Sequence, residues 1–238
     1  MTPPALSIVI PAFNEAERLP RTLERIAAHL AGGGSGGEVL VVDDGSRDGT
    51  AERAEAMGAT VLRNGANRGK GFAVRRGMLA AQGRRRLMTD ADLSTPIEEL
   101  DRLAARMDEG YDVVIGSRAL PESRIEVHQP WFRENMGRLF NLFVRGLVVP
   151  GIRDTQCGFK LFTAEAARAV FSAARLDGFS FDVEALFLAA RKGCRIAEVP
   201  VLWRNDAASR VSLRRGFLAF PDLLRIRANQ LAGRYDDR

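Results

Sequence analysis

Residues 39–50 read VLVVDDGSRDGT, a short apolar run that ends in two acids and a glycine and then passes into a helical pattern. The run Val39–Val42 has the length and the β-branched composition of a buried strand. The pattern over Thr50–Met57 is typical of a helix, and we interpret Asp48 as a cap at its start. A strand, a polar turn and a helix in this order form the unit from which parallel sheets are built.

The same alternation recurs along the first half of the chain. The further expected strands are Leu6–Ile10, Ala59–Leu62, Arg86–Thr89 and Asp112–Gly116, and the further expected helices are Ala16–Leu30, Gly69–Ala81 and Pro96–Asp108. Buried strands that alternate with helices predict an α/β fold, with a Rossmann-like, mostly parallel sheet flanked by helices. Such sheets bind ligands at the carboxyl ends of their strands, where the acidic and glycine-rich residues of this chain fall.

The composition is that of a globular protein with a basic balance. Of 238 residues, 46% are apolar, and 35 Lys and Arg against 30 Asp and Glu give a net charge of +5. This balance favours an anionic partner (a phosphorylated substrate, a membrane surface or nucleic acid) or reflects only a solvated surface. Cys157 and Cys194 are too few for a disulfide framework or a zinc cluster, so we expect a reducing cytoplasm. We expect no signal peptide in Met1–Ala5 and no membrane-spanning segment.

Two carboxylates follow the fourth expected strand. Asp90 and Asp92, separated by the small residue Ala91, can hold a hard divalent cation together with a phosphate. Such a cation offsets the charge of a leaving diphosphate. The structural alternative for one of the two aspartates is a cap for the helix that starts near Pro96.

Two glycine-rich segments precede these carboxylates. Residues 67–71, NRGKG, carry glycines and cations that suit a diphosphate at a helix N-terminus. Residues 31–37, AGGGSGG, precede a strand rather than a helix and lack the lysine of a P-loop. We interpret this second segment as a flexible surface connector.

Two basic amphipathic helices are expected in the second half of the chain. Trp131–Val149 places Phe, Met and Leu at helical spacing between arginines, and Leu213–Leu231 repeats the pattern. Pro221 is expected to kink or divide the second of these helices. Helices of this kind can lie in a membrane interface, although an apolar stripe also forms protein cores.

Four segments of the first half, in this order and spacing, resemble the family-2 glycosyltransferases, which have the GT-A nucleotide-sugar-binding fold: IVIPAFNE (8–15), VVDDGSRDGT (41–50), NRGKGFAV (67–74) and TDADLSTP (89–96). The resemblance implies one GT-A domain over residues 1–238, with a nucleotide-sugar-binding half at about 6–116 and an acceptor-binding half at about 117–232. It implies that Mg²⁺ or Mn²⁺ binds at Asp90 and Asp92. The residues implied to bind the nucleotide sugar are Pro11, Phe13, Glu15, Asp43, Asp44, Lys70, Asp90, Ala91 and Asp92.

Four segments of the second half resemble the dolichyl-phosphate β-glucosyltransferases and their polyprenyl-phosphate relatives: GSR (116–118), RDTQCGFKLF (153–162), FDVE (181–184) and EVPVLW (198–203). This resemblance implies inverting transfer of a sugar, glucose from UDP-glucose, to a dolichyl or polyprenyl phosphate. The chain departs from the pattern at residues 207–210, AASR, where relatives often carry a Gly-x-Ser-Lys-like segment. Arg210 keeps the positive charge, and we expect it to close over the nucleotide diphosphate.

A lipid phosphate acceptor needs less help from the protein than a sugar hydroxyl. A phosphate monoester is largely ionised at pH 7, so it can attack the anomeric carbon without a catalytic base. The enzyme must then hold two anions together, which accounts for a basic chain. We expect Arg118, Arg133 and Lys160 to hold the acceptor phosphate.

The catalytic residues that we expect are Asp92, Arg118, Asp154 and Asp182. Asp154 and Asp182 are the candidates if a base is used, and either could instead orient a cation or a sugar hydroxyl. Because a polyprenyl phosphate keeps its tail in the bilayer, we expect peripheral attachment to the inner face of the cytoplasmic membrane. The segments expected to bind there are Trp131–Val149 and Leu213–Leu231.

Other interpretations of the sequence stay open. The segment TDADLS also resembles the nucleophile loop of haloacid-dehalogenase-type phosphatases, but that loop normally follows an early strand. No strand is followed by the full glycine fingerprint of an NAD-binding dehydrogenase, and with no recognisable nucleic-acid-binding module we expect no nucleic-acid partner. The alternative enzymes are a GDP-mannose-dependent polyprenyl-phosphate mannosyltransferase and a family-2 enzyme that acts on a glycan hydroxyl. The alternative outside enzymes is a nucleotide-sugar-binding membrane adaptor.

Overall fold

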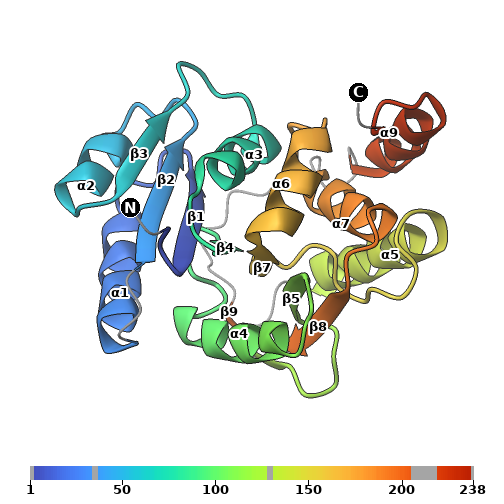
Figure 1. Ribbon diagram of the computed structural model, residues 1–238, viewed down its shortest axis with the longest axis horizontal. Helices are drawn as coiled ribbons and strands as arrows, with labels where there is room; N and C mark the ends of the chain where they lie inside the picture. Colours follow the sequence, from blue (N-terminus) through green and yellow to red (C-terminus); the bar gives the residue numbers. More distant parts are fainter. Residues whose placement is uncertain (1–2, 34–36, 128–130, 205–218, 237–238) are drawn as a thin grey trace.

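Seven strands form the main sheet of the computed structural model, which describes residues 3–33, 37–127, 131–204 and 219–236 (Figure 1). They are β1 (Leu6–Ala12), β2 (Gly37–Asp43), β3 (Thr60–Arg63), β4 (Arg85–Met88), β5 (Val113–Ser117), β7 (Lys160–Thr163) and β8 (Ile196–Pro200). Their order across the sheet is β3-β2-β1-β4-β7-β5-β8. Two further strands, β6 (Arg124–Val127) and β9 (Leu202–Arg204), pair in parallel as a small second sheet.

The main sheet is parallel except at β7. The pairs β1–β2, β2–β3, β1–β4 and β5–β8 are parallel, whereas β7 is antiparallel to both β4 and β5. The prediction of a mostly parallel α/β sheet is therefore confirmed. Because β7 runs in the opposite direction, its first residue, Lys160, lies opposite Met88 and Ile115 near the carboxyl ends of β4 and β5.

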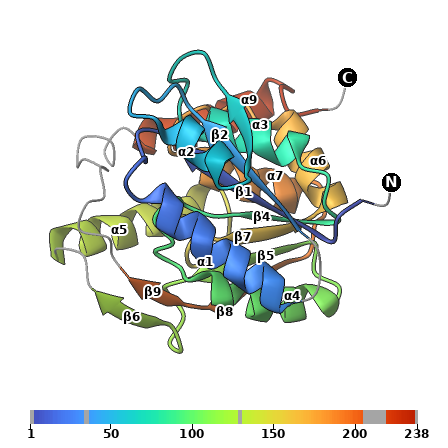
Figure 2. The same cartoon turned by 90° about the vertical axis from the view of Figure 1, so that its left-hand side faces the viewer.

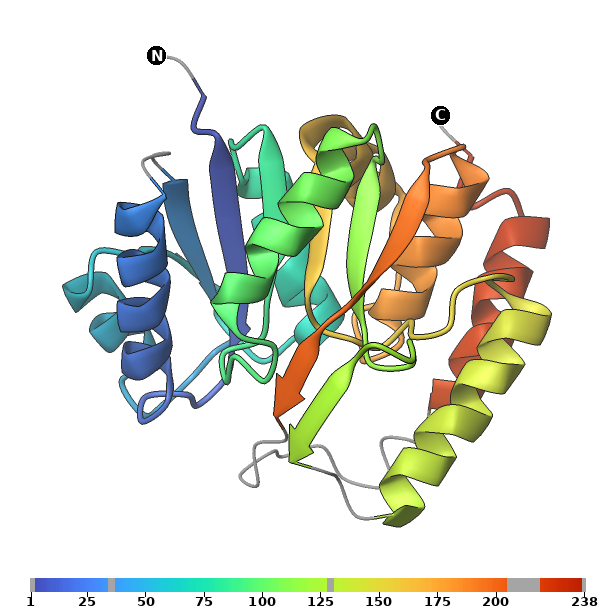
Figure 3. The same cartoon turned by 90° about the horizontal axis from the view of Figure 1, so that it is seen from below.

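Helices cover both faces of this sheet (Figures 2 and 3). On one face pack α1 (Leu19–Gly32), α2 (Thr50–Ala56), a 3₁₀ turn (Ile97–Glu99) and α4 (Leu100–Asp108). On the other pack α3 (Lys70–Ala80), α6 (Ala164–Ala173) and α7 (Phe181–Arg191). Two more helices, α5 (Trp131–Leu147) and α9 (Ala219–Leu231), lie next to each other at the outer edge of this second layer.

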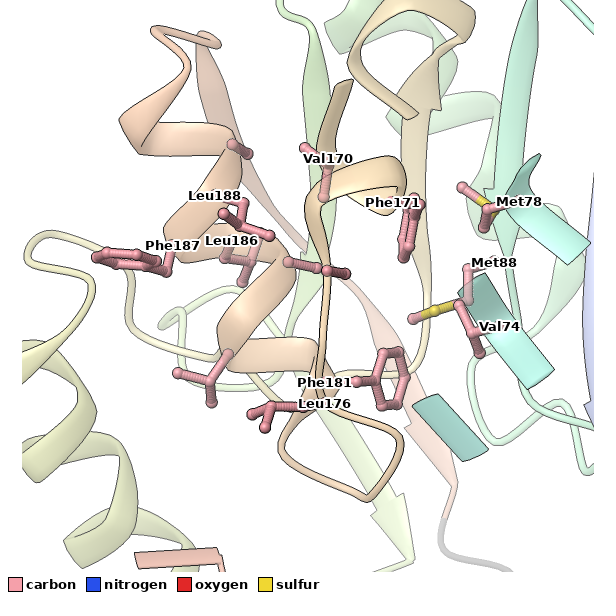
Figure 4. Close-up of a cluster of buried hydrophobic side chains, with 14 of the residues drawn as sticks. Val74, Met78, Met88, Val170, Phe171, Leu176, Phe181, Leu186, Phe187 and Leu188 are labelled. Atoms are coloured by element: carbon pink, nitrogen blue, oxygen red, sulfur yellow. The ribbon is translucent and has the colours of Figure 1, made fainter. Parts of the chain in front are cut away.

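The core on the second face ties together the helices that carry site residues. Figure 4 shows Val74 and Met78 of α3, Phe171 of α6 and Phe181 of α7 in one cluster. These four side chains are at most 3% exposed. Full burial of a side chain of this size stabilises a protein by about 1.5–3 kcal/mol, so the relative positions of the three helices are firmly set.

The five strands expected in the first half are present, and none of their ends is shifted by more than two residues. Helix α1 begins three residues later than expected, because the amides of Arg18 and Leu19 donate to the carbonyl of Glu15 and form a turn there. The second amphipathic helix is described from Ala219 onward, and residues 213–218 lie outside the described part. Pro221 is the third described residue of α9, which continues as a helix to Leu231.

The helices α5 and α9 pack against each other through aromatic rings. Phe220 of α9 lies edge-on to Phe140 and Phe143 of α5, with ring centroids 5.2 and 5.5 Å away. The Arg227 side chain adds a hydrogen bond from Nε to the carbonyl of Leu147 at 2.6 Å. Within the described ranges, no helix is long and apolar enough to cross a membrane.

Candidate active site

The acidic loop after β4 lies at the carboxyl end of that strand, as the sequence predicts. Within the loop, the amide of Ser94 donates to Asp92 Oδ1 at 2.9 Å and so orients this carboxylate. The hydroxyl of Thr22 on α1 donates to the carbonyl of Ala91 at 2.6 Å. From the opposite side, the amide of Arg204 on β9 donates to the carbonyl of Ser94 at 2.8 Å. The loop is thus fastened to two separate elements.

Asp90 is held between a lysine and a glycine. The Nζ atom of Lys70, at the start of α3, is 2.6 Å from Asp90 Oδ1. The backbone of Gly158 lies against the other oxygen, since a β-carbon on that residue would be 2.2 Å from Oδ2. About a third of the Asp90 side chain stays exposed. Beside it lies a small pocket lined by Thr89, Asp90, Ser94, Thr95, Gly158, Phe159 and Trp203.

Negative charge is concentrated at this loop. Burial raises the pKa of Asp92, and the charge of Asp90 raises it further. Burial alone would lower the pKa of Lys70, but the charges of Asp90, Asp182 and Asp92 outweigh burial and raise it above its usual range. Lys70 is therefore charged at neutral pH and compensates part of the negative charge of the loop.

The donor set of the loop fits a divalent cation that binds together with a phosphate. Among the residues that the structure describes, no three His, Cys, Asp or Glu side chains gather closely enough to hold a metal ion alone. Asp90 and Asp92 would supply two carboxylates. Mg²⁺ is commonly held by one or two carboxylates, with substrate phosphates and water completing its coordination.

A second lysine–aspartate pair is buried deeper in the protein. The Lys160 ammonium is fully buried and donates to Asp182 Oδ1 and to the carbonyl of Cys157, both at 2.5 Å. Burial raises the pKa of Asp182, and the charges of Lys160 and Lys70 oppose that shift. The expectation that Lys160 binds the acceptor phosphate does not fit this burial. Its contact with Cys157 instead fixes the peptide group that precedes Gly158.

Arg118 and Asp154 form a two-bond ion pair at the carboxyl end of β5. Arg118 Nε is 2.7 Å from Asp154 Oδ2 and Nη2 is 2.9 Å from Oδ1. Burial alone would raise the pKa of Asp154, but the charge and hydrogen bonds of Arg118 lower it to about 2. Glu198 accepts from the amides of Arg153 and Asp154 and so holds their loop in place. The Arg118 guanidinium also lies 5.4 Å from the ring centroid of Trp203.

Asp44 organises the segment between β3 and α3. Its carboxylate accepts from the side chain of Asn64 at 2.8 Å and from the amide of Gly69 at 2.8 Å. It also accepts from the amide of Arg68 at 3.0 Å and is only 3% exposed. Asp44 therefore shapes the segment that leads to Lys70, whatever contact it makes with a nucleotide.

The glycines of residues 67–71 permit close backbone packing instead of forming a phosphate cradle. The amides of Gly71 and Phe72 donate to the carbonyl of Asp177 at 2.8 and 3.3 Å. A β-carbon on Gly69 would be 2.3 Å from that same oxygen. The prediction of a diphosphate at this helix N-terminus is therefore wrong, because the backbone of Asp177 already occupies it.

The end of β1 and the segment after it carry three of the residues expected at the nucleotide. Phe13 is 40% exposed and Pro11 is half-buried. The carboxylate of Glu15 accepts two hydrogen bonds from Arg18 at 2.8 Å. Asp43, at the end of the neighbouring β2, is only 5% exposed. The sheet thus brings these residues to one edge, where Phe13 offers an exposed ring.

Asp48 binds the start of α2, but from one residue outside the N-cap position that the sequence predicts for it. Its carboxylate accepts from the amide of Thr50, the first residue of α2, and from the amide of Ala16, both at 3.1 Å. The N-cap position itself is held by Gly49, whose φ is +84°. Asp48 therefore links the start of α2 to the segment after β1.

Two expected site residues cannot be placed in this arrangement. Arg210 lies outside the described residues, and Arg133 belongs to α5 but its side chain also lies outside them. Three residues that shape the site, Gly158, Trp203 and Glu198, were not predicted to do so, although they lie within segments that the sequence singles out. Their roles depend on close packing between distant segments, which a single sequence does not reveal.

Comparison with known proteins places this geometry in a family. Residues 7–171 match the sequence profile of Glycosyl transferase family 2. The dolichyl-phosphate beta-glucosyltransferase of Dictyostelium discoideum is 36% identical over 96% of this chain and 75% of that protein. The protein of the same name from Homo sapiens is 36% identical over 96% of this chain and 76% of that protein.

Solved structures are similar across nearly the whole fold. Glucosyl-3-phosphoglycerate synthase from Mycobacterium tuberculosis in complex with UDP has a TM-score of 0.70 at 22% identity, covering 94% of this chain and 80% of that one. The same enzyme in complex with Mn²⁺, UDP and glucosyl-3-phosphoglycerate has a TM-score of 0.68 at 20% identity, over 94% and 80% of the two chains. These similarities establish the GT-A fold. The chain belongs to glycosyltransferase family 2, and the two relatives named above, which match it over most of its length, are dolichyl-phosphate β-glucosyltransferases.

Proposed function

We propose that this chain transfers glucose from UDP-glucose to a dolichyl or other polyprenyl phosphate, with inversion at the anomeric carbon and with a divalent cation. The observation that carries the proposal is the similarity to dolichyl-phosphate β-glucosyltransferases over 96% of the chain. It includes the acceptor half, where Arg118, Asp154 and Asp182 lie.

The state of the two carboxylates in the acceptor half supports an acceptor that arrives already ionised. Asp154 is 1% exposed, bound twice by Arg118, and its pKa is lowered to about 2, which makes it a poor base. Burial raises the pKa of Asp182, but this carboxylate is only 6% exposed and its Oδ1 atom already accepts from Lys160 at 2.5 Å, so it is not open to an acceptor hydroxyl. A phosphate monoester has a second pKa of about 6 and needs no base, whereas a sugar hydroxyl does.

Asp90 and Asp92 are the residues that we assign to the cation, Mg²⁺ or Mn²⁺. When bound, the cation would offset the charge that develops on the departing diphosphate. Lys70 keeps the Asp90 carboxylate in place at 2.6 Å and brings a positive charge to the same region. The raised pKa of Asp92 is consistent with a site whose excess negative charge a cation relieves.

Arg118 is the cation that we assign to the acceptor phosphate. The Nε and Nη2 atoms of Arg118 donate to Asp154, which fixes the plane of the guanidinium. A quarter of the Arg118 side chain is exposed. The aromatic ring of Trp203 supports the guanidinium from one side. A guanidinium held in this way is oriented for an oxyanion before the acceptor arrives, which is the arrangement that favours catalysis.

We also propose that the outer face of α5 and α9 binds the inner face of the cytoplasmic membrane. This face carries exposed apolar side chains on both helices, although each helix also packs into the core. The residues are Leu142, Phe143 and Leu147 of α5, and Leu224 and Leu231 of α9, with exposed fractions from 43% to 88%. Arg145, Arg225 and Arg227 are exposed on the same helices, which suits an anionic lipid surface.

A panel of donors tests the proposed reaction. The purified protein would be incubated with UDP-glucose, UDP-galactose, UDP-N-acetylglucosamine or GDP-mannose and a polyprenyl phosphate, with and without a chelator. We expect one glycolipid product, from UDP-glucose, and its loss when the chelator is present. The unphosphorylated polyprenol is the matched acceptor and should give no product.

Each alternative predicts a different result in this panel. Product from GDP-mannose alone would support the mannosyltransferase. Equal transfer to polyprenol would show that the acceptor does not need an ionised phosphate. Binding of UDP without product from any donor would favour the adaptor. Product that resists the chelator would exclude the proposed cation.

A further inference from the structure

Glu184 on α7 is a buried carboxylate that the proposed reaction does not use. It is 0% exposed, and its Oε2 atom accepts from the amides of Arg175 and Leu176 at 2.9 and 2.8 Å. Its Oε1 atom accepts from the hydroxyl of Tyr235 at 2.6 Å. A buried carboxylate with three donors is strongly held, because each bond involves a charged acceptor.

The segment that Glu184 holds packs directly on the start of α3. The carbonyl of Asp177 accepts from the amides of Gly71 and Phe72, which are in the first turn of that helix. A β-carbon on Gly71 would lie 2.4 Å from the carbonyl oxygen of Leu176. The contact is therefore made by backbone on both sides and leaves little room for adjustment.

A side-chain contact makes the same connection further along α3. Arg75 Nη2 is 2.8 Å from Asp177 Oδ1, and Arg75 Nη1 donates to the carbonyl of Ala174 at 3.2 Å. Leu176 and Phe181 belong to the buried cluster that also contains Val74 of α3 (Figure 4). Helix α3 is thus docked on residues 174–177 at both its first and its second turn.

Lys70 is the first residue of α3 and depends on this docking. Its neighbours Gly69 and Gly71 pack tightly against the backbone of Leu176 and Asp177, since a β-carbon on Gly69 would be 2.3 Å from the Asp177 oxygen and one on Gly71 2.4 Å from the Leu176 oxygen. Its Nζ atom lies 5.8 Å from the ring centroid of Phe181 and 2.6 Å from Asp90 Oδ1. A shift of the Leu176–Asp177 backbone would therefore move the lysine relative to Asp90.

We propose that Glu184 is a positioning residue for Lys70, acting through the backbone of residues 175–177, and that Tyr235 holds Glu184 in the required orientation. This proposal rests on the proposed function in one respect: it takes Lys70 to be part of the site that binds the nucleotide sugar. Burial, then the hydrogen bond to Glu184, raises the pKa of Tyr235, so its hydroxyl remains a donor. Glu184, the last residue of the segment FDVE, therefore has a different role from Asp182 in the same segment, which binds Lys160.

The test compares Glu184→Gln and Tyr235→Phe with the wild-type chain. The first readout is hydrogen–deuterium exchange in the peptide that contains Gly71 and Phe72, measured without ligand. The second is the affinity for UDP with Mn²⁺, measured by calorimetry well below the unfolding temperature of each variant. For Glu184→Gln we expect exchange to be faster and UDP binding weaker, each by about tenfold, because a neutral amide replaces a charged acceptor. Tyr235→Phe should act in the same direction and less strongly.

Asp236→Asn is the matched control. Asp236 is next to Tyr235 and forms an ion pair with Arg191 at the end of α7, whereas Glu184 is held by other donors. We expect this variant to match the wild type in both readouts. Equal acceleration of exchange in Asp236→Asn would overturn the proposal, since any loosening of the chain end would then have the same effect.

The remaining outcomes also decide. Unchanged exchange at Gly71 and Phe72 in both test variants would overturn the role of Glu184, even with weaker UDP binding. If Glu184→Gln does not fold, Tyr235→Phe carries the test. Failure of the wild-type chain to bind UDP would contradict the proposed function, while exchange would still report whether Glu184 holds the first turn of α3.

Discussion

The backbone of Gly158 lies against the carboxylate of Asp90 so closely that a β-carbon on residue 158 would be 2.2 Å from Asp90 Oδ2. The preceding peptide carbonyl, of Cys157, accepts from the buried ammonium of Lys160. Lys160 is in turn paired with Asp182 of α7. Residues from the second half of the chain therefore fix the position of an aspartate that belongs to the first half.

We expect Gly158→Ala to reduce transfer strongly while the protein stays folded. The added methyl group must displace the Asp90 carboxylate, because the glycine backbone is held by Lys160 and cannot retreat. Misplacement of a catalytic group by about 1 Å costs on the order of 100-fold in rate. Initial rates and thermal unfolding of the two proteins give the measurement.

Gly146→Ala is the matched control for that substitution. Gly146 lies in α5, and a β-carbon added there would have open space around it to 4 Å. Alanine in a helix interior is favoured over glycine by about 1 kcal/mol, so this variant should be at least as stable and fully active. If Gly158→Ala kept wild-type activity, the close contact between Gly158 and Asp90 would not be required for transfer.

Asp92→Asn should lose transfer without losing the fold. We expect a decrease of about 100- to 1,000-fold, typical for removal of a charged group from a preorganised site. Burial and the charge of Asp90 raise the pKa of Asp92, so its ionised form opposes folding at neutral pH. The unfolding temperature should therefore stay equal or rise. Retained activity in this variant would contradict the assignment of the cation to Asp90 and Asp92.

The sequence alone is sufficient to predict the first half of the fold and the position of the acidic loop. Short apolar runs such as Val39–Val42 mark strands by composition, and the carboxyl ends of parallel strands must share one edge. The antiparallel strand β7 was not predicted, because Lys160 gives it a charged first residue. Its burial is possible only with Asp182, which is 22 residues away in sequence.

The glycines of residues 67–71 explain the main error at the site. Glycine permits close approach of another group, and the sequence does not say whether that group is a phosphate or a backbone. Here it is the carbonyl of Asp177. The hydrogen bond from the amide of Leu176 to Glu184 joins residues eight positions apart in the sequence. No helical or strand periodicity connects these two positions, so the sequence pattern does not indicate the bond.

The pair Arg118–Asp154 predicts a defined loss of stability in acid. The pKa of Asp154 is about 2 in the folded chain and 3.8 ordinarily, so its contribution is complete above the ordinary value and is lost as the pH falls toward 2. The shift corresponds to about 2 kcal/mol. We expect Asp154→Asn to be less stable than wild type at neutral pH, with the difference narrowing between about pH 5 and pH 2. Urea unfolding at several pH values measures this difference, and parallel curves for the two proteins would contradict it.

The outer face of α5 and α9 predicts binding to anionic vesicles. Leu142 and Leu224 are 63% and 68% exposed, and transfer of each side chain from water into lipid is worth about 1.5–3 kcal/mol. The double variant Leu142→Glu, Leu224→Glu should therefore float with vesicles at least about tenfold less than wild type at low salt. Leu79→Glu is the matched control, because Leu79 is 42% exposed on α3, away from this face, and should float as wild type does.

The double variant should also keep its activity toward a short-chain acceptor in detergent, since its substitutions lie outside the site. If all three proteins floated equally, the membrane contact would lie elsewhere on the molecule. If Leu79→Glu lost as much flotation as the double variant, the loss would be a nonspecific effect of added negative charge.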